Sequence, residues 1–288
     1  MRAWFACGST WIVSLVTLAF ARDWGPLQIA LGFGAFCFVL IGIVRATGSA
    51  DAEDTLRIPR AHAGAVTGAA IAVLFGALML ATQAVIWQMF GGPHIAPLSN
   101  VIAWFAGLHT GYELGGQPFF MTLAFVIVPL AVLAFARVRP RDLGLRLPDG
   151  RSRVAALAML ALPVGILIVG LTAGHHTLGD AFLILAMNLL NNGLPEETFF
   201  RGVLMSYGRA WLATPWAIYA TALAFSLFHV PVTLALEEHG HVVLAIANTI
   251  GENLPFGVAM SLLALRTRSL AMPIVLHFSL DALRHMLP

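Results

Sequence analysis

Long apolar segments separated by short polar ones dominate the hydrophobic pattern of this chain. Most of them run for about twenty residues, and at ~1.5 Å per residue a helix of that length matches a bilayer core of roughly 30 Å. The pattern therefore predicts helices rather than barrel strands, which span a membrane with about ten residues. We place the helices at residues 3–21, 26–44, 64–90, 118–136, 154–172, 181–209, 215–230, 242–265 and 269–287. The expected fold is an all-α polytopic bundle with eight or nine transmembrane spans.

Composition supports the same class of protein. Hydrophobic residues make up 59% of the chain and charged residues 10%, and the mean hydropathy is +0.85. These values are far from those of a soluble domain. No internal repeat or long linker divides residues 1–288, so we expect a single transmembrane domain. The two cysteines, Cys7 and Cys37, both lie in predicted spans and indicate neither a disulfide framework nor a thiol site.

The positions of the basic residues predict the orientation of this bundle. All sixteen are arginines. With the N-terminus in the cytoplasm, thirteen fall in cytoplasmic segments, two (Arg22 and Arg284) fall outside and Arg201 lies within the membrane. This asymmetry follows the positive-inside rule, and the reverse orientation would place the six arginines of the 137–153 loop outside. Because topology accounts for that loop, we expect the lipid bilayer as a partner and no nucleic acid.

The first predicted span raises the question of a secretory signal. Ala19-Phe20-Ala21 resembles a small-x-small cleavage site. The apolar stretch is long, however, and another span follows almost at once. We therefore expect an uncleaved first helix.

Residues 91–117 form the longest break between predicted spans. Within this break, residues 101–105 are mostly apolar and include Trp104. A short interfacial helix with Trp104 at headgroup level would explain them. An ordinary external loop explains them equally well.

The candidate chemistry begins with three charged residues inside one apolar segment. Glu196, Glu197 and Arg201 lie between Ala181 and Trp211. An ionisable residue at membrane depth costs about 3 kcal/mol or more and indicates a functional site. We expect a local break at residues 191–194, after which Pro195 restarts the helix. Such a break must line a cavity or be buried in protein, and it would put both carboxylates near a positive helix N-terminus.

Helical spacing separates the roles of the two carboxylates. Glu197 and Arg201 are four residues apart and can pair on one helix face, whereas Glu196 points about 100° away. We therefore interpret Glu197 as structural and Glu196 as a general base that works near neutral pH. The alternative is a buried ion network that only holds helices together.

Two later segments supply partners for Glu196. Phe225 and His229 share one helix face, and His277 and Asp281 share another. Either pair alone is weak, because a single histidine in a span is more often a packing residue. Counted along the helices, Glu196, His229 and His277 fall at similar depths near the bilayer middle. We expect them to converge on one polar cavity.

These residues resemble three motifs of the CPBP intramembrane proteases, a family that includes type II CAAX prenyl proteases and bacteriocin-processing or immunity proteins. The family's EExxxR pattern corresponds to residues 196–201, its FxxxH pattern to residues 225–229 and its HxxxN/D pattern to residues 277–281. The order and separations of the motifs also fit. The resemblance covers about residues 180–288, and we expect the protease-like core at about residues 154–288.

The stretch before His277 extends the resemblance. It matches at Thr267, Ser269, Leu270, Pro273 and Ile274. The departure is Arg268, where relatives commonly carry glycine. This difference concerns the geometry of the local turn rather than the catalytic groups.

The resemblance implies a glutamate-dependent endopeptidase that cleaves a membrane-associated or membrane-inserted peptide. Glu196 and His229 would activate water, and His277 and Asp281 would support the oxyanion. Asp281 would accept a hydrogen bond from His277 and so aim the ring, as the third member of a triad does. The supporting residues would be Glu197, Arg201 and Phe225.

A metal site is the nearest mechanistic alternative. Zinc has nitrogen and oxygen ligands and keeps one position open for water, which would suit a set made of Glu196, His229, His277 and Asp281. No HExxH helix is present, and the resemblance favours catalysis without metal. We therefore expect no cofactor.

Two other functions fit part of the pattern. Buried carboxylate, imidazole and guanidinium groups beside a broken helix suit a proton-coupled transporter, although we find no inverted repeat. A catalytically silent immunity or partner-binding member of the family is the other alternative. The prediction with most support is an intramembrane protease in the cell membrane of a bacterium.

Overall fold

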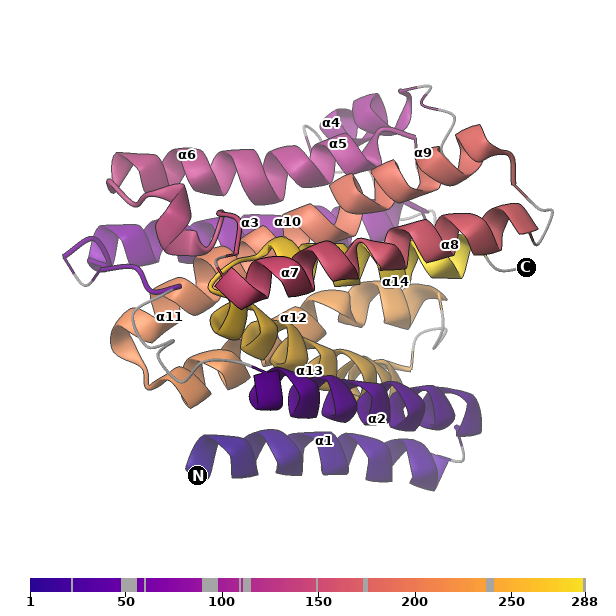
Figure 1. The fold of residues 1–288 in the computed structure, drawn as a ribbon, viewed down its shortest axis with the longest axis horizontal. Coiled ribbons are helices and arrows are strands. Elements are labelled where there is room, and N and C mark those ends of the chain that lie inside the picture. The colour runs from indigo at the N-terminus through magenta and orange to yellow at the C-terminus, as the bar shows by residue number, and fades with distance from the viewer. Residues whose placement is uncertain are drawn as a thin grey trace.

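The computed structural model of the protein is a bundle of helices (Figure 1). It describes residues 1–21, 23–47, 56–59, 61–89, 98–108, 110, 115–148, 150–172, 176–236 and 241–286. Throughout these ranges every regular element is helical and none is a strand. The predicted all-α class is confirmed.

Most of the chain lies in long helices and short helical segments that continue one another. In chain order they are α1 (Arg2–Ala21), α2 (Trp24–Thr47), α3 (Ala65–Met89), α4 (Leu98–Ala106), α5 (Gln117–Thr122), η1 (Leu123–Ile127), α6 (Val128–Phe135), η2 (Pro140–Leu143), α7 (Gly150–Met159), α8 (Ala161–Thr172), α9 (Leu178–Asn188), η3 (Leu189–Gly193), α10 (Leu194–Glu196), η4 (Glu197–Met205), α11 (Ser206–Trp211), α12 (Thr214–Leu236), α13 (Val242–Thr267) and α14 (Ala271–Met286). Of these, η2 is a 3₁₀ turn, whereas η1, η3 and η4 are π-helical.

The long helices run roughly side by side along the longest axis of the molecule (Figure 1). Helices α12 and α13 pack against each other, and α1 and α2 pack against the other side of α13. Helix α14 contacts α8, α9 and η3. The three motif-bearing elements, η4, α12 and α14, therefore meet inside the bundle.

The predicted spans correspond to helices in the structure, with a difference at residues 154–172. Among the described residues, five helical stretches are long and apolar enough to cross a membrane on their own: α1, α2, α5 to α6, α12 and α13. The count of eight or nine spans stays a prediction. Residues 154–172 do not form one straight helix but two, α7 and α8, which meet at Leu160. Pro163 explains this, because it has no N–H to donate to the carbonyl four residues earlier.

A short helix, α4, is present where we considered an interfacial helix. It includes Trp104, whose side chain is exposed. The helical alternative for this segment is confirmed. Its position at a membrane interface remains a prediction.

Several connections that carry arginines meet at one end of the bundle. The Ile58 N–H donates to the Ser206 carbonyl (3.0 Å), and the Leu270 N–H donates to the Gly144 carbonyl (2.9 Å). The Arg146 Nε donates to the Arg268 carbonyl (2.8 Å). The connections that carry Arg57, Arg146 and Arg268 therefore lie together at one pole of the fold. The orientation of that pole relative to the cytoplasm stays a prediction.

Arg268 ends α13 in a left-handed conformation, with φ 55°. Glycine is the residue that adopts this conformation without steric cost, so an arginine at this position carries a steric cost. The arginine keeps the turn because its carbonyl accepts the Arg146 hydrogen bond.

Candidate active site

The two adjacent glutamates lie in a helix that becomes π-helical twice, in η3 and in η4. We expected a break at residues 191–194, and this is wrong: η3, α10 and η4 continue α9 with helical backbone angles. Pro195 has no N–H to donate, and π-helical turns on both sides accommodate it without ending the helix. Such turns are frequent at functional sites. The polar groups are therefore displayed by an irregular helix rather than by a gap.

Glu197 is the anchor of the site. Its Oε1 accepts a hydrogen bond from Arg201 Nη1 (3.0 Å) and lies 2.7 Å from His277 Nδ1. Glu197 and Arg201 are both completely buried. The ion pair predicted from the four-residue spacing is present, and it also fixes a ring from α14.

The imidazole of His277 is aimed by Glu197, not by Asp281 as we expected. Because a carboxylate accepts hydrogen bonds, the close contact with Glu197 puts a proton on His277 Nδ1. His277 Nε2 lies 3.5 Å from Asp281 Oδ2, which is a longer contact. The four-residue spacing in the sequence predicted a contact between His277 and Asp281. Glu197 is 80 residues away from His277 in sequence, and only the three-dimensional fold shows that the two are in contact.

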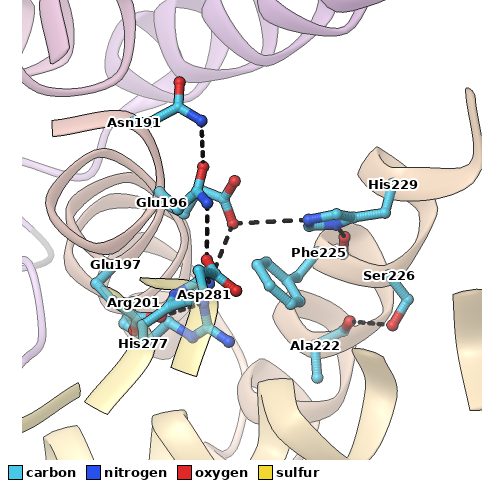
Figure 2. Close-up of polar contacts among 11 residues, drawn as sticks. Asn191, Glu196, Glu197, Arg201, Ala222, Phe225, Ser226, His229, His277 and Asp281 are labelled. Carbon is cyan, nitrogen blue, oxygen red and sulfur yellow. Dashed lines mark hydrogen bonds and ion pairs between the residues drawn. The ribbon is translucent and has the colours of Figure 1, made fainter. Parts of the chain in front are cut away.

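Glu196 faces both imidazoles. Its Oε2 lies 3.7 Å from His229 Nε2 and 3.7 Å from His277 Nε2. In Figure 2, the Glu196 carboxylate lies between His229 from α12 and His277 from α14. These distances are longer than direct hydrogen bonds, but they allow one water molecule to contact the carboxylate and a ring together. The predicted convergence of the three residues is confirmed.

His229 presents its second nitrogen to Glu196. Its Nδ1 lies 2.8 Å from the Phe225 carbonyl, and since a carbonyl only accepts, Nδ1 carries the proton. In the neutral ring Nε2 is then an acceptor, and this is the atom that faces Glu196. Such a ring can take a proton from a neighbouring water.

Phe225 forms the apolar wall between these groups. Its ring centroid lies 4.4 Å from the Arg201 guanidinium carbon and 4.7 Å from the centroid of the His229 ring. A cation over an aromatic face is stabilised by the ring quadrupole. Phe256 of α13 lies 4.9 Å from the ring of His277 and covers another side. The ionised groups are thus separated from the surrounding lipid by aromatic rings.

One side of the site is more accessible than the other. The side chains of His229 and Asp281 are 24% and 22% exposed. Those of Glu196 and His277 are each 6% exposed. A substrate that reaches Glu196 would therefore approach past His229 and Asp281.

The residues considered as zinc ligands lie close to one another around Glu196. In the described part of the chain, no group of three or more histidine, cysteine, aspartate or glutamate side chains is arranged to hold a metal ion. His277 Nδ1 contacts Glu197, so its Nε2 is the ring nitrogen that faces Glu196.

The sequence interpretation missed two polar residues near the site. Asn192 donates to Asp281 Oδ2 (2.7 Å), and Asn191 donates to Asn192 Oδ1 (2.6 Å). The sequence feature that could have indicated Asn192 is its spacing, because it precedes Glu196 by four residues.

Comparison with protein families gives one match, and it covers the site. Residues 178–283 match the model described as type II CAAX prenyl endopeptidase Rce1-like. Comparisons with curated proteins and with solved structures found no match. The resemblance predicted from the three motifs is confirmed over this part of the chain. With the apolar helices, the match supports an integral membrane protein and, at family level, an intramembrane protease of the CAAX type.

Proposed function

We propose that this chain, whose residues 178–283 form an Rce1-like domain, hydrolyses a peptide bond of a membrane-associated substrate with water activated by Glu196. The observation that carries the proposal is the position of Glu196 Oε2, 3.7 Å from the Nε2 atoms of both His229 and His277. A carboxylate with two imidazoles at this distance can hold a water molecule and take its proton. One imidazole can then stabilise the product of the attack.

In the first step the water oxygen attacks the carbonyl carbon of the peptide bond. The proton of the water passes to Glu196, with His229 Nε2 as the neighbouring acceptor. His229 is suited to this because its Nδ1 proton is committed to the Phe225 carbonyl. The ring therefore keeps one tautomer and one orientation, which a proton acceptor requires.

The negative charge that forms on the carbonyl oxygen needs a hydrogen-bond donor. His277 supplies it when its Nε2 carries a proton, because its Nδ1 already donates to Glu197. Arg201 balances the charge of Glu197. In the second step the proton held by Glu196 moves to the leaving nitrogen, the C–N bond breaks, and a carboxylic acid and an amine are released. One water is consumed and no cofactor takes part.

The test is cleavage of a membrane-embedded peptide library by the purified protein in lipid vesicles. Wild type is compared with Glu196→Gln, each with and without a chelator. We expect cleavage by wild type that the chelator does not change, and a loss of about 100-fold or more in the variant, because general base catalysis contributes roughly that much. Asp142→Asn, a carboxylate-to-amide change in η2 at the arginine-rich end, is the matched control and should leave cleavage unchanged.

Other outcomes would replace the proposal. Loss of cleavage with chelator would make the same residues a zinc site. Full activity of Glu196→Gln would remove this residue from the mechanism. If wild type cleaves no peptide in the library, the transporter or the silent family member becomes the better interpretation.

A further inference from the structure

A chain of hydrogen bonds between side chains runs from η3 into the candidate active site. Asn191 Nδ2 donates to Asn192 Oδ1 (2.6 Å), and Asn192 Nδ2 donates to Asp281 Oδ2 (2.7 Å). Asn191 is buried and Asn192 is half-buried. The chain ends at the residue that also lies 3.5 Å from His277 Nε2.

The chemistry of the groups fixes the direction of this chain. An ionised carboxylate only accepts hydrogen bonds, so the amide atom of Asn192 that faces Asp281 must be the nitrogen. The amide oxygen of Asn192 then points the other way and must accept, which requires the nitrogen of Asn191. Neither amide can flip without losing a contact. Asn191 therefore locks the orientation in which Asn192 donates to Asp281.

Asp281 has two competing donors on the same oxygen. Its Oδ2 lies 2.7 Å from Asn192 Nδ2 and 3.5 Å from His277 Nε2. An ionised carboxylate that captured the Nε2 proton of His277 would occupy the donor that a substrate oxyanion needs, and its charge would oppose the oxyanion. The shorter contact shows that Asn192, not His277, holds this oxygen. His277 does not need Asp281 for its orientation, because Glu197 anchors the ring.

We propose that Asn192, locked by Asn191, is a positioning residue that keeps the Asp281 carboxylate away from His277 Nε2, so that the imidazole can donate to the substrate carbonyl. The inference rests on the proposed function, because it assigns His277 the role of oxyanion donor. It also explains how an aspartate can occupy a position where an asparagine would donate directly.

The test is a double-mutant cycle on cleavage in lipid vesicles. The variants are Asn192→Leu, which keeps a similar size without polar atoms, Asp281→Asn and their combination. In the wild-type background, we expect Asn192→Leu to lower kcat about 10- to 100-fold, the size of one hydrogen bond to a charged group, with KM nearly unchanged. In the Asp281→Asn background, no carboxylate competes for His277. There the same change should cost no more than about twofold, the usual limit of additivity.

A role of Asn192 in folding alone would give a different pattern. Thr122→Val is the matched control, because Thr122 Oγ1 donates to the Leu190 carbonyl in the same π-helical segment without touching Asp281. Its effect on kcat should be the same in both backgrounds. If Asn192→Leu does not fold, Asn191→Ala replaces it. That variant frees the amide of Asn192 and should lower kcat less, with the same dependence on Asp281.

Two results would overturn the inference. Equal losses from Asn192→Leu in both backgrounds would show that Asn192 does not act through Asp281. A rise in KM with unchanged kcat would make Asn192 a substrate-binding group. These results are distinct from failure of the proposed function, in which wild type would not cleave or Glu196→Gln would cleave normally.

Discussion

The helices before residue 173 and those after residue 177 bury very different shares of their side chains. In the membrane-spanning stretches, 17% of residues are buried in α1, 28% in α2 and 33% in α5 to α6. The share is 50% in α12 and 67% in α13. Among the described residues, the buried polar ones of the first region are Ser14 and Thr67, and all others lie from Asn188 onward. The first region is therefore suited to contact with lipid, and the second to contact with other protein side chains.

This contrast reflects what each region requires of its sequence. A lipid-facing helix needs apolar side chains of almost any shape, because acyl chains fill the space around them. A buried polar site needs each partner in place, because an unpaired polar group in a medium of low dielectric is costly. Only the second requirement leaves a pattern specific enough for a family model. The match accordingly covers residues 178–283 and not the helices that precede them.

Removal of a buried charge from the second region should have a stronger effect on stability than the other changes. Arg201→Ala should destabilise the protein by about 3–5 kcal/mol, because Glu197 would be left buried without its cation. The measurement is the yield of folded protein and its thermal stability in detergent. Removing both charges with Glu197→Gln and Arg201→Ala together should restore part of the stability. Arg141→Ala, an exposed arginine, is the matched control and should have no effect.

A different result would change the role of Arg201. Normal yield together with lost activity would indicate that Arg201 contacts the substrate, not that it balances Glu197. Equal losses for Arg201→Ala and Arg141→Ala would contradict the comparison itself. The cost would then come from the removal of any arginine and not from burial.

The same comparison explains how much the sequence could predict. The helices were predictable because apolarity and length decide both the pattern and the fold. The pair of Glu197 and Arg201 was predictable because four residues span one helical turn. The π-helical path through Pro195 was not, since a change of hydrogen-bond register leaves the apolar pattern unaltered and a proline suggests a break. The contact between Asn192 and Asp281 joins residues 89 apart, and no local spacing indicates it.

A smaller effect is expected where α12 and α13 touch. A Cβ on Gly257 would lie 2.8 Å from Ala222 Cβ and 2.9 Å from Ala222 Cα, whereas one on Gly32 of α2 would meet nothing within 4 Å. Because α12 also carries His229, Gly257→Ala should move this ring away from Glu196. We expect a loss of about 1–3 kcal/mol, as for other overpacked sites, together with lower activity.

Gly32→Ala is the control for that prediction. It makes the same chemical change in a helix with open space around the new methyl group. Thermal unfolding and peptide cleavage should both match wild type. If the two alanine variants behaved alike, close approach of α12 and α13 would not be what positions His229.

The smallest effects test whether the lipid-facing region tolerates changes of shape. Val203 is completely buried in η4, and Val39 of α2 is 63% exposed. Val203→Leu should cost about 1 kcal/mol, because the added volume has no space in a packed core. Val39→Leu should stay within about 0.5 kcal/mol, because the larger side chain only displaces lipid. Thermal stability in vesicles measures both changes. A loss for Val39→Leu as large as that for Val203→Leu would mean that α2 packs against a further protein surface, and the contrast between the two regions would then reflect a missing partner rather than contact with lipid.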